Sequence, residues 1–180
     1  MKLKLSIAIL AVVAATATTA VAGSASIASR PATSSGTIVQ VAASNPQLST
    51  LVSLVKKAGL AGALSKGSLT VFAPTNAAFA YLKSHDPATY KSATTNASVL
   101  KKVLTYHVIG KKIPASAATA AAKKGASVKT LEGESITLSL VKGKIKLNKS
   151  ATVIQADVMA SNGVVHVINR VLVPPSLSMK

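Results

Sequence analysis

The chain has no cysteine and no tryptophan, and only four of its 180 residues are acidic. Without cysteine there is neither a disulfide framework nor a lipobox cysteine that could carry a lipid. An oxidising compartment is tolerated, but no covalent cross-link forms there. Aromatic residues make up 3% of the chain, so few side chains are available to stack on bases. Because base-edge reading also relies on arginine, and only Arg30 and Arg170 are present, we expect no specific nucleic-acid partner.

The shortage of acidic residues gives a formal net charge of +17, which becomes +15 when Lys2 and Lys4 are removed with the N-terminal segment. A domain this basic is expected to bind anionic surfaces, such as acidic polysaccharides. Our candidate contacts with an anionic polymer are Lys142, Lys144, Lys146 and Lys149. The lysines are dispersed and form no block of five or six like charges. The alternative interpretation is therefore an ordinary solvated surface.

Long apolar runs are confined to the N-terminus. Residues 1–22 have the order of a secretory signal peptide: a basic start, an apolar run, and the cleavage pattern Ala20-Val21-Ala22. An uncleaved membrane anchor is the alternative, but the run is short for a membrane span. Residues 23–36 are rich in Ser, Ala and Thr and predict a flexible linker. We therefore expect a chain that is secreted, extracellular or on the cell surface, without a transmembrane segment after cleavage.

The first half of the remaining chain has mostly helical periodicity. Two segments of this half depart from that periodicity: the apolar run Leu69–Ala73 predicts a buried strand, and the polar segment His85–Asn96 predicts a loop. We expect helices from Thr37, after Asn45-Pro46, over Leu60–Leu64, from Asn76 to about Leu82, after the cap Asn96, and over Ala115–Lys124.

The second half has the alternation of strands. "SITLSLVKGKIKLN" holds two alternating runs around Lys142-Gly143, which is a strong hairpin signal. We expect further strands at Ala151–Val158 and Val164–Val173, separated by a turn at Asn162-Gly163. Helices followed by strands, without regular alternation, predict an α+β fold with a mainly antiparallel sheet.

No catalytic motif stands out. There is no GxSxG elbow, no HExxH or HxH spacing, and no glycine-rich phosphate loop. The histidines are His85 in a polar loop and His107 and His166 in strand-like segments, with His166 facing outward or satisfied locally. Glu132 and Glu134 flank Gly133, which favours a turn over an acid–base pair. We therefore predict no enzymatic activity, no metal site and no cofactor.

Three stretches together resemble the sequence blocks of the fasciclin domain: "TVFAPTNAAF" (Thr70–Phe79), "YHVI" (Tyr106–Ile109) and "NGVVHVINRVLVP" (Asn162–Pro174). The resemblance extends over the expected domain, residues 37–175, before a tail at 176–180. It implies a β-sandwich or wedge of about seven mainly antiparallel strands with a helical layer from the N-terminal half. Ala77 and Asn169 stand where many members carry acidic residues, which casts doubt on functions that need those carboxylates.

The resemblance also supplies candidate adhesion residues, namely Asp157, Val158, Tyr106 and His107. An Asp followed by Ile or Leu near this place has been linked to integrin recognition in animal members, and here Val158 takes the second position. The alternative is an Asp at a strand end that satisfies backbone N–H groups. For the pair Tyr106-His107, the resemblance implies internal hydrogen bonds.

The remaining motif residues are expected to be structural. Pro74 cannot donate a ladder hydrogen bond and should end its strand, Thr75 should cap the next helix, and Phe79 should return to the core. The full structural set is Thr70, Pro74, Thr75, Asn76, Phe79, Asn162, Gly163 and His166.

Two functions are compatible with these patterns. The first is a monomeric, non-catalytic adhesion or matrix-interaction module that binds an anionic polysaccharide or a cell-surface or matrix protein. The alternative is a soluble carrier of an apolar small molecule such as a carotenoid, with small residues (Ala61, Ala63, Ala78) leaving a groove between helices and sheet. Asn96 and Asn148 begin N-glycosylation sequons, which matter only in a host that has that machinery.

Overall fold

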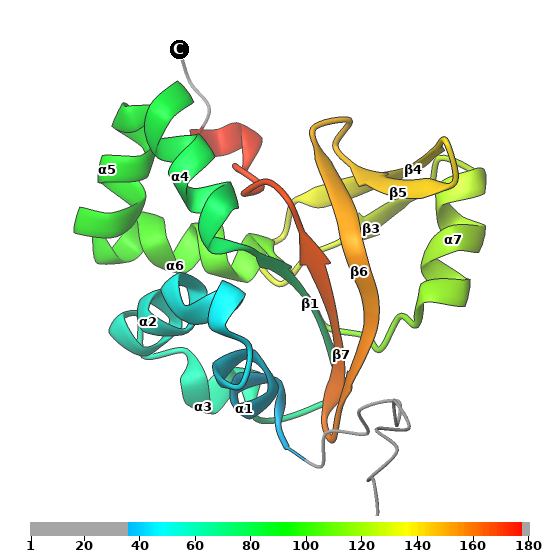
Figure 1. The fold of residues 1–180 in the computed structure, drawn as a ribbon, viewed down its shortest axis with the longest axis horizontal. Coiled ribbons are helices and arrows are strands. Elements are labelled where there is room, and N and C mark those ends of the chain that lie inside the picture. Colours follow the sequence, from blue (N-terminus) through cyan, green and yellow to red (C-terminus); the bar gives the residue numbers. More distant parts are fainter. Residues whose placement is uncertain (1–35, 178–180) are drawn as a thin grey trace, which may run out of the picture.

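A computed structural model describes residues 36–177 of the chain (Figure 1). The expected signal peptide, the linker up to residue 35 and residues 178–180 lie outside the described residues. The helical elements are α1 (Ile38–Ala43), η1 (Pro46–Leu48), α2 (Ser49–Lys57), α3 (Ala61–Leu64), α4 (Asn76–His85), α5 (Pro87–Thr95), α6 (Ala97–Tyr106), α7 (Ala115–Lys123) and η2 (Pro175–Leu177). The strands are β1 (Leu69–Pro74), β2 (Val108–Ile109), β3 (Ser127–Lys129), β4 (Ser135–Val141), β5 (Lys144–Leu147), β6 (Ala151–Ala160) and β7 (Gly163–Ile168).

The strands form one mixed, seven-stranded sheet in the order β2-β1-β7-β6-β5-β4-β3. Only the pair β1–β7 is parallel, and the other pairs are antiparallel. Figure 1 shows α1 to α6 gathered on one side of β1 and β7, with α7 and the β3–β5 end of the sheet on the other side. The expected α+β wedge of about seven mainly antiparallel strands with a helical layer is confirmed.

The central strands β1 and β7 are buried along their whole length, because each has a core on both faces. Val71 and Val165 pack into the core under α1 to α6, whereas Phe72 and Ile168 pack into a second core with α7, β4 and β5. Strands buried on both faces are expected to be continuously apolar, as these are. By contrast, β4 alternates, with Ile136 and Leu138 inside and Ser135 and Thr137 exposed.

The structure corrects three sequence predictions about elements. The segment expected to be a loop between His85 and Asn96 holds helix α5, which begins at Pro87. Asp86 caps this helix, because its Oδ1 accepts from the Thr89 N–H at 3.0 Å. The expected strand Val164–Val173 ends at Ile168, because its partner β1 ends at Pro74, which has no N–H. His107 is not in a strand but closes helix α6, and β2 begins only at Val108.

The other expected elements agree with the structure. Asn96 caps α6 by accepting from the Ser98 N–H at 3.0 Å, and Lys142-Gly143 closes the β4–β5 hairpin. The turn at Asn162 joins β6 to β7.

Candidate functional site

The β4–β5 hairpin presents two lysines on its outer face. Lys144 and Lys146 alternate with the buried Ile145 and Leu147, so their side chains leave the sheet on the side away from the core. Lys144 pairs with Val141, whereas Lys146 lies between Ser139 on β4 and Thr152 on β6. The cross-strand neighbours of both lysines therefore carry no charge.

Two turns add the other two lysines. Lys142 (φ 51°) and Gly143 (φ 74°) are both left-handed, as the tightest hairpin turn requires. Asn148 (φ 47°) and Lys149 (φ 60°) repeat this geometry between β5 and β6. We call Lys142, Lys144, Lys146 and Lys149 the hairpin lysines. Lys142, Lys144 and Lys149 are exposed and Lys146 is half-buried.

The hairpin lysines lie close enough to act together on an anion. Lys144 and Lys146 are two strand residues apart, which is about 7 Å along the chain, within the screening length of about 8 Å at physiological salt. Glu132 and Glu134 lie in the turn before β4, at the end of that strand opposite to Lys142. Lys129 on β3 shares the outer face, because its partner Ser135 is exposed. The sequence reasoning missed Lys129, although its alternation with Val128 was a usable signal.

Tyr106 and His107, two of the candidate adhesion residues, lie inside the protein, with 0% and 2% of their surfaces exposed. The Tyr106 hydroxyl accepts from Asn148 Nδ2 at 2.7 Å, and burial raises the pKa of Tyr106. His107 Nδ1 donates to the Val103 carbonyl at 2.7 Å, and Nε2 accepts from the Leu172 N–H at 2.9 Å. Burial lowers the pKa of His107 to about 4. These side chains are inaccessible to a partner and hold the fold together, as the resemblance implied for this pair.

Asp157 is exposed on β6, and Val158 is half-buried beside it. Asp157 lies in a bulge of the β6–β7 ladder and is left-handed, with φ 55°. Its Oδ1 accepts from the N–H of Ala115, the first residue of α7, at 2.7 Å. Asp157 thus joins β6 to the start of α7, which agrees with the alternative interpretation of an Asp that satisfies backbone groups.

His166 faces the second core and is 1% exposed. Of the two sequence expectations, the outward-facing ring is wrong and the ring satisfied by local hydrogen bonds is confirmed. It stacks with Phe72, with 5.7 Å between ring centroids. Nε2 donates to the Ile113 carbonyl at 2.9 Å, and Nδ1 accepts the otherwise unpaired N–H of Asp157 at 3.3 Å. Burial lowers the pKa of His166. His166 is therefore the internal support of the bulge that carries Asp157.

The remaining motif residues serve the scaffold. Thr75 Oγ1 caps α4 by accepting from the Ala78 N–H at 3.2 Å, and Phe79 is buried. Thr70 Oγ1 donates to the Lys111 carbonyl at 2.7 Å. Asn76 Oδ1 accepts from the Thr50 N–H at 3.0 Å, which fastens α2 to α4.

Asn162 and Gly163 join the helical layer to the sheet. Asn162 Oδ1 accepts from the Ile38 N–H at 2.9 Å, and Nδ2 donates to the Leu64 carbonyl at 2.8 Å. Gly163 faces the start of β1 so closely that a Cβ there would overlap the Leu69 carbonyl oxygen.

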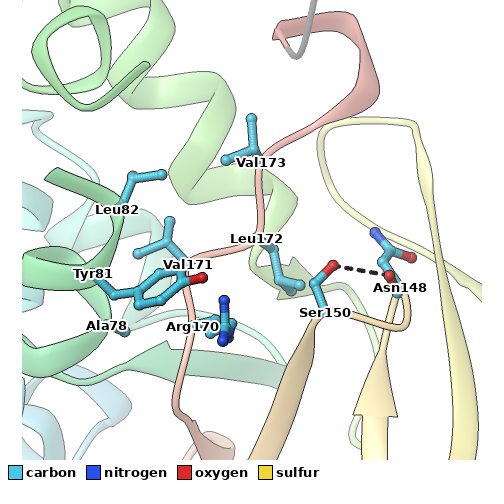
Figure 2. Close-up of a pocket in the computed structure, with 9 residues that line it drawn as sticks. All are labelled: Ala78, Tyr81, Leu82, Asn148, Ser150, Arg170, Val171, Leu172 and Val173. Atoms are coloured by element: carbon cyan, nitrogen blue, oxygen red, sulfur yellow. Dashed lines mark hydrogen bonds between the residues drawn. The ribbon is translucent and has the colours of Figure 1, made fainter. Parts of the chain in front are cut away.

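A pocket of about 260 Å³ lies where the last segment of the chain passes between α4 and the β5–β6 turn (Figure 2). Its polar lining comes from Tyr81, Asn148, Ser150 and Arg170, and Leu82 and Val171 are among its apolar lining residues. Sequence reasoning did not identify this pocket, because Tyr81 and Arg170 are far apart in the chain and belong to no motif that pairs them.

The junction between helices and sheet holds a second, apolar cavity, lined by residues that include Phe79, Leu100 and Leu104. Its volume is about 10 Å³, roughly the minimum for one water molecule. The three alanines expected to leave a groove do not line this cavity. Ala61 is half-buried and Ala63 is exposed, and the buried Ala78 lines the pocket of about 260 Å³ instead. A polyene could enter only if the helices moved apart.

Within residues 36–177, no three metal-ligating side chains come together. In the same range, no helix has the length and apolarity needed to span a membrane.

The fasciclin-domain family model matches residues 46–174. Protein sll1483 of Synechocystis sp. is 50% identical over 153 residues, which cover 83% of this chain and 80% of that protein. The pig transforming growth factor-beta-induced protein ig-h3 is 38% identical over 142 residues, covering 78% of this chain but 20% of the larger protein.

A solved structure has the same fold. It is a pair of FAS1 domains from the insect cell adhesion molecule fasciclin I, with a TM-score of 0.68 and 19% identity. The match covers 80% of this chain and 53% of that one.

Proposed function

The chain belongs to the fasciclin family, and from this membership we propose that it is a secreted, non-catalytic adhesion module that binds an anionic polymer through the hairpin lysines. The similar FAS1 domain pair belongs to a cell adhesion molecule. The observation that carries the proposal is the position of four lysines on one outer face and its two adjoining turns, where the cross-strand neighbours of Lys144 and Lys146 are uncharged. An acidic polysaccharide, or an acidic surface of a matrix protein, is the kind of partner that this charge would attract.

The contact would be mainly electrostatic. Each exposed lysine contributes little by itself in water, whereas several lysines along one polyanion act jointly. The backbone of the binding residues lies in strands and tight turns, so the freedom lost on binding would be mainly that of the lysine side chains. We propose a monomer, because one face is sufficient for this contact.

The test is the affinity for heparin, used as a model polyanion, at about 0.1 M and about 1 M salt. The screening length falls from about 10 Å to about 3 Å over this range, so binding should weaken strongly. Affinity that is unchanged over this range would contradict the mechanism.

The place of binding is tested with two variants of equal net charge. In the first, the four hairpin lysines are replaced by glutamine. In the second, glutamine replaces four exposed lysines of the helical half, Lys56, Lys91, Lys101 and Lys102. The hairpin variant should lose most of the binding, and the helical variant should lose less. Equal losses would mean that only the total charge matters.

A carotenoid carrier is the alternative proposal. Reconstitution with a carotenoid, followed by an absorption spectrum of the repurified protein, tests it. A bound pigment would support the carrier function, and a colourless protein would rule it out.

A further inference from the structure

We propose that the pocket between α4, the β5–β6 turn and Val171–Val173 binds a small amphipathic carboxylate, with Arg170 holding the carboxylate and the aliphatic wall holding the apolar body. This goes beyond the polymer-binding proposal, since it uses neither the hairpin lysines nor the outer face of the sheet.

Tyr81 fixes the position of Arg170. The Arg170 Cζ lies 3.8 Å from the centre of the Tyr81 ring. The His85 ring stacks at 3.7 Å between centroids, with an interplanar angle of 17°. Two groups at this distance cannot share one face, so His85 and Arg170 lie on opposite faces of Tyr81. The ring therefore holds the guanidinium from one side and leaves no face of its own for a ligand.

Arg170 keeps its hydrogen-bond donors available. A stacked guanidinium directs its N–H groups outward in its own plane, which matches the two oxygens of a carboxylate. Within residues 36–177, Arg170 has no carboxylate at ion-pair distance and no acceptor for these N–H groups. Figure 2 shows Arg170 between Tyr81 and Ser150, at the edge of the pocket. A guanidinium whose five N–H donors have no protein partner, placed beside a cavity, can bind an anion that enters the cavity.

The rest of the pocket selects against hydrophilic anions. Leu82 and Val171–Val173 contribute aliphatic surface. The polar groups on the other side are already engaged: Asn148 Nδ2 donates to Tyr106, and the Ser150 hydroxyl donates to the Asn148 carbonyl at 2.9 Å. Because these donors are already used, the several hydroxyls of a sugar acid would find fewer partners here than they have in water. An aliphatic body would instead gain by leaving water.

The size of the pocket sets the size of the ligand. Its volume of about 260 Å³ is just below the usual range of about 300–1,000 Å³ for ligand pockets. One carboxylate on a compact, branched aliphatic group fits this volume, whereas a long acyl chain does not.

The probe is 4-methylpentanoate, followed by calorimetry and by the NMR signals of the Arg170 side chain in the purified protein. Three matched compounds separate the contributions: 4-methylpentanamide lacks the charge, acetate lacks the apolar body, and galacturonate replaces that body with hydroxyls. Saturable binding of 4-methylpentanoate, at least about tenfold tighter than that of the three others, supports the proposal. Equal or tighter binding of galacturonate, or binding of the amide with equal affinity, overturns it.

Variants test the two residues. R170Q should weaken binding of 4-methylpentanoate roughly 10- to 100-fold, and R170K should recover only part, because an ammonium lacks the planar fork. Y81F should bind 4-methylpentanoate normally, because the phenyl ring still supports the guanidinium. Y81L should bind it more weakly, because it has no ring on which Arg170 can stack. The control is the variant in which glutamine replaces the four hairpin lysines. It should keep its affinity for 4-methylpentanoate while its affinity for heparin falls. If R170Q keeps full affinity, the proposal is wrong even if polymer binding holds.

Discussion

The Nε2 atom of His107 accepts a hydrogen bond from the backbone N–H of Leu172 at 2.9 Å, across 65 residues of sequence. This bond ties the end of α6 to the segment that follows β7. It requires a neutral imidazole with its proton on Nδ1, where it is donated to the Val103 carbonyl.

The first prediction is a loss of stability in mild acid. The pKa of His107 is about 4 in the folded protein, against 6.5 for an unperturbed histidine. Between these values the unfolded chain binds more protons, so stability is full above about pH 6.5 and falls as the pH drops toward 4. The free energy of unfolding in urea should decrease by up to about 3 kcal/mol from this residue, and His166, whose pKa is also lowered, acts in the same direction.

H107Q should flatten this pH dependence, and the control H85Q, at an exposed position, should leave it unchanged. If H107Q does not fold, an NMR titration of the wild-type imidazoles decides the question. A His107 ring that titrates near 6.5 in the folded protein would contradict the prediction.

The second prediction concerns two glycines. Gly163→Ala places a Cβ against the Leu69 carbonyl oxygen and 2.9 Å from Ile38 Cδ1. Because backbone atoms must move, we expect a loss of about 3 kcal/mol, at the upper end of overpacking costs. Gly62→Ala in α3 meets nothing within 4 Å and should be neutral or slightly stabilising. Urea midpoints of the two variants measure the difference, and equal midpoints would show that β1 and β7 are less tightly packed at this point.

Asp157 is the subject of the third prediction. Asp157→Ala loses the acceptor for Ala115 and puts alanine at φ 55°, for a combined cost of about 2 kcal/mol. Asp157→Asn retains an acceptor oxygen and tolerates the left-handed backbone, so it should cost less than about 1 kcal/mol. Thermal unfolding of both variants provides the comparison. If the asparagine variant loses as much stability as the alanine variant or more, the charge of Asp157 matters and its shape does not.

The fourth prediction separates the two sequons in a glycosylating host. Asn96 is exposed and uses its Oδ1 to cap α6, which leaves Nδ2 available for a glycan. Asn148 is half-buried, and its Nδ2 donates to the Tyr106 hydroxyl at 2.7 Å. Intact mass should therefore show one glycan, which disappears in N96Q. A glycan that remains in N96Q would place it on Asn148 and contradict this geometry.

Local signals in the sequence were sufficient for much of the fold. Turn and cap residues such as Lys142-Gly143, Thr75 and Asn96 act on their immediate neighbours, and the hairpin, α4 and α6 were predicted from them. Helix α5 was missed because its polar composition outweighed the cap and proline signal at Asp86-Pro87. That helix is held largely by packing: Ala93 is buried and Tyr90 contacts the helical core.

The candidate sites were less predictable, because they depend on contacts between distant residues. The alternation around Ile145 predicted the outward lysines of β5. Nothing local indicated that His166 supports Asp157, nor that Arg170 stacks on Tyr81, 89 residues earlier in the chain. Those relationships arise only when β7 and the segment after it are placed beside β6 and α4.

The most direct test of the polymer-binding account is an NMR footprint of a heparin oligosaccharide on the isotope-labelled protein. The account predicts that the largest chemical-shift changes fall on the backbone and side-chain signals of Lys142–Lys149, with little change in α2 and α6. Changes centred on the helical half, or spread evenly over all exposed lysines, would contradict the assignment of the contact to the hairpin lysines.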